Sequence, residues 1–158
     1  MQIAIALFEH LTALDAVGPY EVLSRIPGAD LHFVGERRGP VRTDTGRLGL
    51  VVDATYDEVP RPDVIVVPGG FGQNDHRDGS PLHRWLKDAD THSSWTTAAC
   101  TGSLILASAG LLTGRRATTH WLAYDELAVF GATPTDTRVV VDGKYATAAG
   151  VSRASTWR

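Results

Sequence analysis

The sequence predicts one α/β domain, a three-layer αβα sandwich with a mostly parallel sheet at its centre. Short apolar, β-branched runs alternate with helical segments along the chain, an order that gives parallel strands covered by helices on both faces. The 158 residues suffice for one buried core. Hydrophobic residues make up 43% and charged residues 21%, the balance of an ordinary globular protein.

The first half of the chain supplies the first expected strands and one helix. Residues 15–26 place apolar side chains at helical spacing, with Pro19 suited to the first turn and Gly28 just past the end. Residues 64–67 are all Val or Ile, which indicates a buried parallel strand. The other expected β segments are residues 3–8, residues 31–34 and a glycine-interrupted stretch at residues 41–53.

The second half predicts one more parallel strand, three helices and a hairpin. Residues 95–99 form the strand, and residues 101–112 form a helix that is apolar on every side and therefore buried. Asp142-Gly143 predicts a tight turn between two short strands. The remaining expected elements are a short exposed helix at residues 81–87, a helix at residues 121–130, and the hairpin strands at residues 139–141 and 145–148.

Charge and cysteine content argue against several classes of protein. The net charge of −3, without a basic cluster, argues against a nucleic-acid surface. The apolar start of the chain has no positive leader and stops at Glu9, so we expect neither a signal peptide nor a membrane span. The single cysteine excludes an internal disulfide, and the cytoplasm is the expected compartment. The histidines other than His120 show no metal-ligand spacing, so we expect no metal.

Cys100 is the candidate nucleophile. It stands directly between the strand at residues 95–99 and the following helix, which is the layout of a nucleophile elbow. Small neighbours, among them Ala99 and Gly102, permit a sharp turn. We expect the helix N-terminus to lower the thiol pKa and Cys100 to lie at the rim of the sheet. An isolated free cysteine is more often buried and structural, but this position favours the nucleophile.

Four further residues are candidates for the same site. Gly69 and Gly70 follow the strand at residues 64–67, so they should share the rim with Cys100, where a glycine N–H can bind an oxyanion; a plain turn is the alternative. Asp15 begins the first helix, and the residues alone favour helix capping over general acid or base catalysis. His120, close in sequence to the expected rim, is either a base or a structural residue at a helix start.

Several motifs of this chain together resemble the PfpI superfamily, and within it the isonitrile hydratases. The motifs are Asp15-Ala-Val-Gly18-Pro19-Tyr-Glu21-Val, Val67-Pro68-Gly69-Gly70, Ala99-Cys100-Thr101-Gly102-Ser103, and Gly114-Arg115-Arg116-Ala-Thr-Thr-His120-Trp121. The resemblance extends from the first strand to about Ser152. It implies a flavodoxin-like fold of the class I glutamine amidotransferase type.

The resemblance also implies an activity and roles for individual residues. Cys100 matches the nucleophile, Asp15 matches an essential aspartate rather than a cap, and Thr101 matches a residue that takes part in the reaction. The implied reaction is hydration of an isonitrile to an N-substituted formamide through a thioimidate on Cys100. It requires no cofactor, and the family form is expected to be a homodimer.

Two other classes within the superfamily stay open. AraC-type transcription regulators carry this domain as a sensor and share the Pro-Gly-Gly and Arg-Arg-Ala-Thr-Thr-His-Trp motifs. Other members are stress-related or chaperone-like thiol proteins. A protease dyad is not expected, because protease-like members have histidine where this chain has Thr101. Deglycase-like members usually have glutamate near the thiol, where this chain has Asp15.

The end of the chain departs abruptly from the resemblance. After Ser152 the family continues roughly Ala-Gly-Ile-Asp-Met-Ala into a long helix, whereas this chain reads Arg-Ala-Ser-Thr-Trp-Arg. Loss of a single base after the Ser152 codon converts one coding of the first sequence into the second. We therefore expect residues 1–152 to be a PfpI-type domain and residues 153–158 an aberrant, frameshifted tail, with the helix that should cover one face of the sheet missing.

Overall fold

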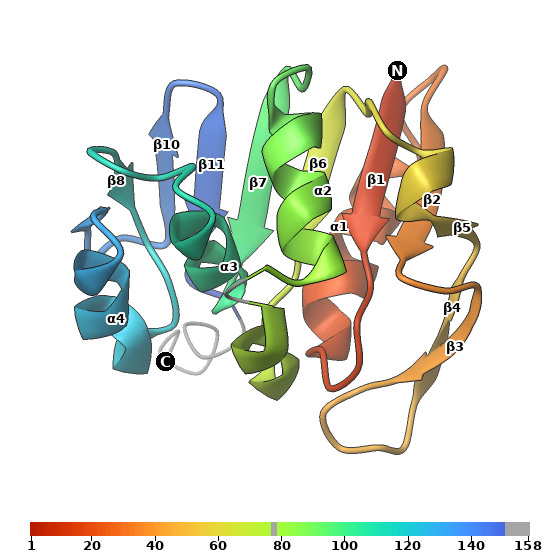
Figure 1. Cartoon of the computed structure of the whole chain (residues 1–158), viewed down its shortest axis with the longest axis horizontal. Coiled ribbons are helices and arrows are strands. Elements are labelled where there is room, and N and C mark those ends of the chain that lie inside the picture. Colours follow the sequence, from red (N-terminus) through yellow and green to blue (C-terminus); the bar gives the residue numbers. More distant parts are fainter. Residues whose placement is uncertain (77–78, 151–158) are drawn as a thin grey trace.

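A seven-stranded sheet runs through the computed structural model, which describes residues 1–76 and 79–150 (Figure 1). Its order is β10-β11-β7-β6-β1-β2-β5, and all neighbouring strands are parallel except β10 and β11. The predicted fold class is therefore confirmed. The strands are β1 (Gln2–Ala6), β2 (Asp30–Gly35), β5 (Ala54–Thr55), β6 (Val64–Val67), β7 (Trp95–Ala99), β10 (Val139–Asp142) and β11 (Tyr145–Ala148).

Helices lie on both faces of this sheet (Figure 1). In the view of Figure 1, α2 and α3 cover the front of the central strands, α1 lies behind them, and α4 stands at the left edge. The helices are α1 (Ala13–Leu23), α2 (Pro81–Asp90), α3 (Gly102–Ser108) and α4 (Tyr124–Val129). Three 3-10 turns lie in the described residues: η1 (Tyr56–Glu58), η2 (Phe71–His76) and η3 (Trp121–Ala123). Two small sheets complete the described chain. One pairs β3 (Gly39–Arg42) with β4 (Gly49–Val52), and the other pairs β8 (Arg116–Ala117) with β9 (Thr133–Pro134).

The central strands are buried on both faces, which explains their uninterrupted apolar sequences. All four residues of β6 are buried, as are the last four of β1. β6 pairs in parallel with β1 on one side and with β7 on the other. Because parallel strands end at the same edge of a sheet, the loops that follow β1, β6 and β7 meet there. This carboxyl edge holds the candidate site.

The face of the sheet that carries α1 is only partly covered in the described residues. Beside α1 lies an apolar groove of about 510 Å³, lined among others by Val22, Trp95 and Val139. Val22 is 68% exposed and Val139 is 58% exposed. The predicted aberrant tail, residues 153–158, lies outside the described residues, so its origin stays a prediction.

Three helices differ from their predicted form. The helix α1 begins at Ala13, so Pro19 lies inside it rather than in the first turn. The predicted exposed helix at residues 81–87 continues to Asp90 and buries one face, on which Trp85 donates from Nε1 to the carbonyl of Val59 at 2.9 Å. The predicted helix at 101–112 spans only Gly102–Ser108. Of the helices in the described ranges, none has both the length and the apolar character needed to cross a membrane.

Candidate active site

Cys100 occupies a strained turn between β7 and α3. Its φ of 54° lies in the left-handed region, which costs a non-glycine residue about 1–2 kcal/mol. The turn is held by backbone atoms of Cys100: its N–H donates to the carbonyl of Ala148 at 2.8 Å, and its own carbonyl accepts from the hydroxyls of Ser103 and Thr119, each at 3.1 Å. Such strain, maintained by surrounding contacts, is typical of a nucleophile elbow.

Glycines let the neighbouring loops approach this turn closely. A Cβ on Gly102 would lie 2.2 Å from the carbonyl oxygen of Val67, and one on Gly69 would lie 2.6 Å from the nitrogen of Thr101. The loops after β6 and β7 are therefore packed more tightly than any side chain would allow. The small residues that the sequence places around Cys100 are required by this contact.

Asp15 lies against the loop that follows β6 and is only 4% exposed. Its Oδ2 accepts a hydrogen bond from the N–H of Gly69 at 3.1 Å. The N-cap position of α1 belongs to Thr12, so the interpretation of Asp15 as a helix cap is wrong. Burial raises the pKa of Asp15 from 3.8 to about 6, the charge of Asp44 adds to the increase, and the Gly69 N–H opposes it. Both protonation states of this carboxyl are therefore accessible near neutral pH.

The thiol of Cys100 does not have the low pKa that the sequence predicts. Burial, and after it the negative charge of Asp15, raise the thiol pKa to about 11, although hydrogen bonds from the N–H and hydroxyl of Thr101 lower it in part. The expectation was wrong because a helix of seven residues cannot offset a buried site with a carboxylate beside it. Near neutral pH the Cys100 thiol consequently keeps its proton, beside an Asp15 carboxyl that titrates near pH 6.

Thr101 connects the thiol to the loop after β6. Its Oγ1 accepts a hydrogen bond from the N–H of Gly70 at 3.0 Å, and its hydroxyl donates to the carbonyl of Gly70 at 3.5 Å. The N–H groups of Gly69 and Gly70 thus position Asp15 and Thr101. Because both N–H groups already have these partners, direct binding of an oxyanion by Gly69 and Gly70 stays a prediction.

A cavity of about 440 Å³ opens above Cys100. Cys100, Thr101 and Gly70 line it, and Phe71 and Leu122 stand at its mouth, 78% and 69% exposed. A cavity of this volume is large enough for a small organic molecule, and Cys100 is in its lining.

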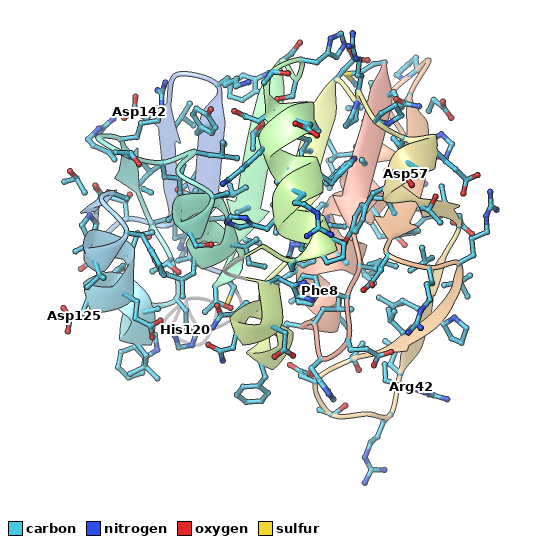
Figure 2. All side chains as sticks on the ribbon, in the orientation of Figure 1. Phe8, Arg42, Asp57, His120, Asp125 and Asp142 are labelled. Carbon is cyan, nitrogen blue, oxygen red and sulfur yellow. The ribbon has the colours of Figure 1, made fainter. Side chains whose placement is uncertain are left out.

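His120 lies in the wall of this cavity, at the carboxyl edge of the sheet below α3 (Figure 2). Its Nδ1 accepts from the N–H of Leu122 at 3.2 Å, and its ring stacks on Trp121 with centroids 5.8 Å apart. Burial lowers the pKa of His120, which favours the neutral form of the ring. His120 therefore lines the cavity, and whether it acts as a base or is structural stays a prediction.

Two residues of the site were missed in the sequence. Thr119, which fixes the Cys100 carbonyl, belongs to the Thr118-Thr119-His120 segment, where only His120 was singled out. Asp44 lines the cavity from the loop between β3 and β4, and no local motif marks it. In the described residues, no group of three or more His, Cys, Asp or Glu side chains is placed to hold a metal ion.

The fold and the cysteine elbow define a class of protein: the chain belongs to the DJ-1/PfpI family, whose model matches residues 1–158. It is similar to the isonitrile hydratase of Pseudomonas putida, with 40% identity over 152 residues, covering 96% of this chain and 66% of the hydratase. A THiJ/PfpI family protein from Pseudomonas syringae has a similar structure, with a TM-score of 0.91 and 38% identity, covering 95% of this chain and 62% of that one.

The family contains other kinds of protein. The HTH-type transcriptional regulator CdhR of Pseudomonas aeruginosa is 35% identical over 122 residues, which cover 75% of this chain and 35% of the regulator. The chain spans slightly less than two thirds of the length of the hydratase and of the Pseudomonas syringae protein.

Proposed function

We propose that this protein hydrates isonitriles, R–N≡C plus water giving R–NH–CHO. The observation that carries the proposal is the Cys100 thiol in the wall of a small cavity, with the buried Asp15 carboxyl, whose pKa is raised to about 6, close enough to act on the thiol through its charge. Similarity to an isonitrile hydratase supports it. The pair suits this reaction because isonitrile hydration needs a nucleophile for one carbon and a proton for the same carbon.

In the first step the sulfur of Cys100 forms a bond to the isonitrile carbon. The thiol proton passes to the Asp15 carboxylate as the sulfur attacks. Asp15 then delivers this proton to the same carbon, which gives the thioimidate R–N=CH–S–Cys100. The high thiol pKa is compatible with this order because the proton leaves the sulfur only as the new bond forms.

In the second step water adds to the thioimidate carbon. Asp15, now a carboxylate, takes one proton from the water and passes it to the nitrogen, which gives the tetrahedral intermediate R–NH–CH(OH)–S–Cys100. The intermediate then collapses: its C–S bond breaks, the hydroxyl proton passes through Asp15 to the sulfur, and the formamide leaves. Thr101 and Gly70, which line the cavity, orient the substrate and the water through hydroxyl or N–H groups. No oxidant, reductant or cofactor enters this balance.

The test is turnover of a simple alkyl isonitrile. Incubation of the protein with n-butyl isonitrile should give N-butylformamide, whose formyl proton is followed by NMR. The Cys100→Ala variant should give none, and Asp15→Asn should be slower by at least about a hundredfold, the usual scale for a general acid–base residue. A folded wild-type protein that forms no formamide contradicts the proposal.

A sensor domain is the second candidate, because the similarity to the regulator CdhR covers 75% of this chain. A sensor would bind a small molecule in the Cys100 cavity without converting it. One measurement distinguishes the two candidates. If the protein is a sensor, added isonitrile should raise its melting temperature in a saturable manner, and the isonitrile concentration should stay constant for hours. If the protein is a hydratase, the isonitrile concentration should fall.

A further inference from the structure

Asp44 gives the cavity above Cys100 a fixed negative wall. The N–H of Asp44 donates to the carbonyl of Leu11 at 2.9 Å, and its Oδ2 accepts from the hydroxyl of Thr12 at 3.1 Å. These two bonds hold the half-buried Asp44 against the loop that follows β1, where it lines the cavity with Cys100. The carboxylate is therefore positioned by the fold and does not move freely at the surface.

No positive charge balances this carboxylate in the described lining of the cavity. Among the described lining residues, His120 has the one basic side chain, and burial lowers its pKa, which favours the neutral form of the ring. Asp15 lies below the floor and contributes negative charge when it is ionised. An anion entering this cavity therefore meets only carboxylates and neutral groups in that lining.

We propose that Asp44 is a charge-selectivity residue, which admits neutral or cationic isonitriles to Cys100 and excludes isonitriles that carry a carboxylate. The substrate part of this inference rests on the proposed hydratase function. Like charges brought together in one cavity disfavour binding, so we expect a preference of at least about tenfold in kcat/KM.

The alternative is that Asp44 only ties two loops together. The Asp44→Asn variant separates the two roles, because an asparagine oxygen can still accept from the Thr12 hydroxyl while the charge is lost. The variant will also alter the pKa of Asp15, to which the Asp44 charge contributes. The ratio of rates for an anionic and a neutral compound removes this common effect.

The first experiment compares 5-isocyanopentanoate with its methyl ester. The wild-type protein should use the ester at least about tenfold better in kcat/KM, and Asp44→Asn should narrow the ratio at least about threefold. Asp57→Asn, on the opposite side of the molecule from His120, is the matched control and should keep the wild-type ratio (Figure 2). Equal use of acid and ester by the wild type, or an unchanged ratio in Asp44→Asn, overturns the inference.

The second experiment does not depend on hydration. Iodoacetamide is neutral and iodoacetate is an anion, and each alkylates the single cysteine with loss of iodide. Relative to free cysteine, Cys100 should favour iodoacetamide at least about tenfold, and Asp44→Asn should reduce this preference while Asp57→Asn should not. If no formamide forms but Cys100 still prefers iodoacetamide, the hydratase function is refuted and the role of Asp44 stands. Equal labelling by both reagents refutes the role of Asp44 alone.

Discussion

Replacing Asp15 with asparagine should stabilise the protein at high pH while it impairs function. The side chain is 4% exposed, and burial is the main cause that raises its pKa from 3.8 to about 6. This increase corresponds to about 3 kcal/mol of unfolding free energy, at 1.36 kcal/mol per pKa unit. The amide of an asparagine has no charge to desolvate, and its oxygen can still accept from Gly69.

The sign of the effect follows from proton binding. The folded protein holds the Asp15 proton more tightly than the unfolded chain does, so the contribution of Asp15 to stability is fully present below pH 4. It is lost as the pH rises from about 4 to about 6, because folding then requires either a buried charge or a bound proton. The stability gained by Asp15→Asn should grow by about 3 kcal/mol between pH 4 and pH 8.

Urea denaturation of both proteins at pH 4, 5, 6 and 8 measures this difference. Asp88→Asn, an exposed carboxyl on α2, is the control and should stay within about 0.5 kcal/mol of the wild type at every pH. Parallel stability curves for wild type and Asp15→Asn would show that the Asp15 pKa is ordinary, and the role of Asp15 as an acid and base near neutral pH would fail.

Three other predictions concern the elbow and the whole chain. Thr101→Val removes the acceptor of the Gly70 N–H and should lower kcat at least about tenfold, whereas Thr101→Ser should recover most of it; equal loss in both would show that the hydroxyl is not the cause. Gly102→Ala should lower the free energy of unfolding by about 2 kcal/mol or more, because the new Cβ would lie 2.2 Å from the Val67 carbonyl oxygen. Gly18→Ala, which has open space around it, is the control and should raise the free energy of unfolding by up to about 1 kcal/mol. We also propose that the coding DNA after Ser152 encodes, in another frame, an amphipathic helix that covers the apolar groove beside α1; a frame without such a helix would contradict this proposal. We further propose that the protein with its frame restored is a homodimer, and a monomer in light scattering would contradict that proposal.

The elements that sequence predicts best are those whose local pattern and tertiary role agree. The four Val and Ile residues of β6 have no stable place except between two strands in a covered sheet, and they were predicted at their observed positions. The turn at Cys100 was predicted because a strand, a small residue and a helix follow one another without a loop. In both cases the residues of the element and its immediate neighbours in the sequence are enough to predict the local structure.

Other features depend on contacts between distant residues. The start of α1 is fixed by the Thr12 N–H, which donates to the carbonyl of Gly69 at 2.8 Å, so the helix begins before the position that Pro19 indicated. The helix N-terminus near Cys100 is visible in the sequence, whereas the burial and the neighbouring Asp15 that raise the thiol pKa are not. Asp44 reaches the cavity through a hairpin whose place is set by Leu11 and Thr12.

The central claim is that Cys100 bonds to the isonitrile carbon, and a rapid acid quench followed by mass spectrometry tests it most directly. With n-butyl isonitrile in excess, the account predicts that the protein mass rises by the mass of one isonitrile within the first turnover. The added mass should lie on the peptide that contains the single cysteine, and Cys100→Ala should show none. Steady formation of N-butylformamide by Cys100→Ala, with no adduct on the wild-type protein, would contradict the account.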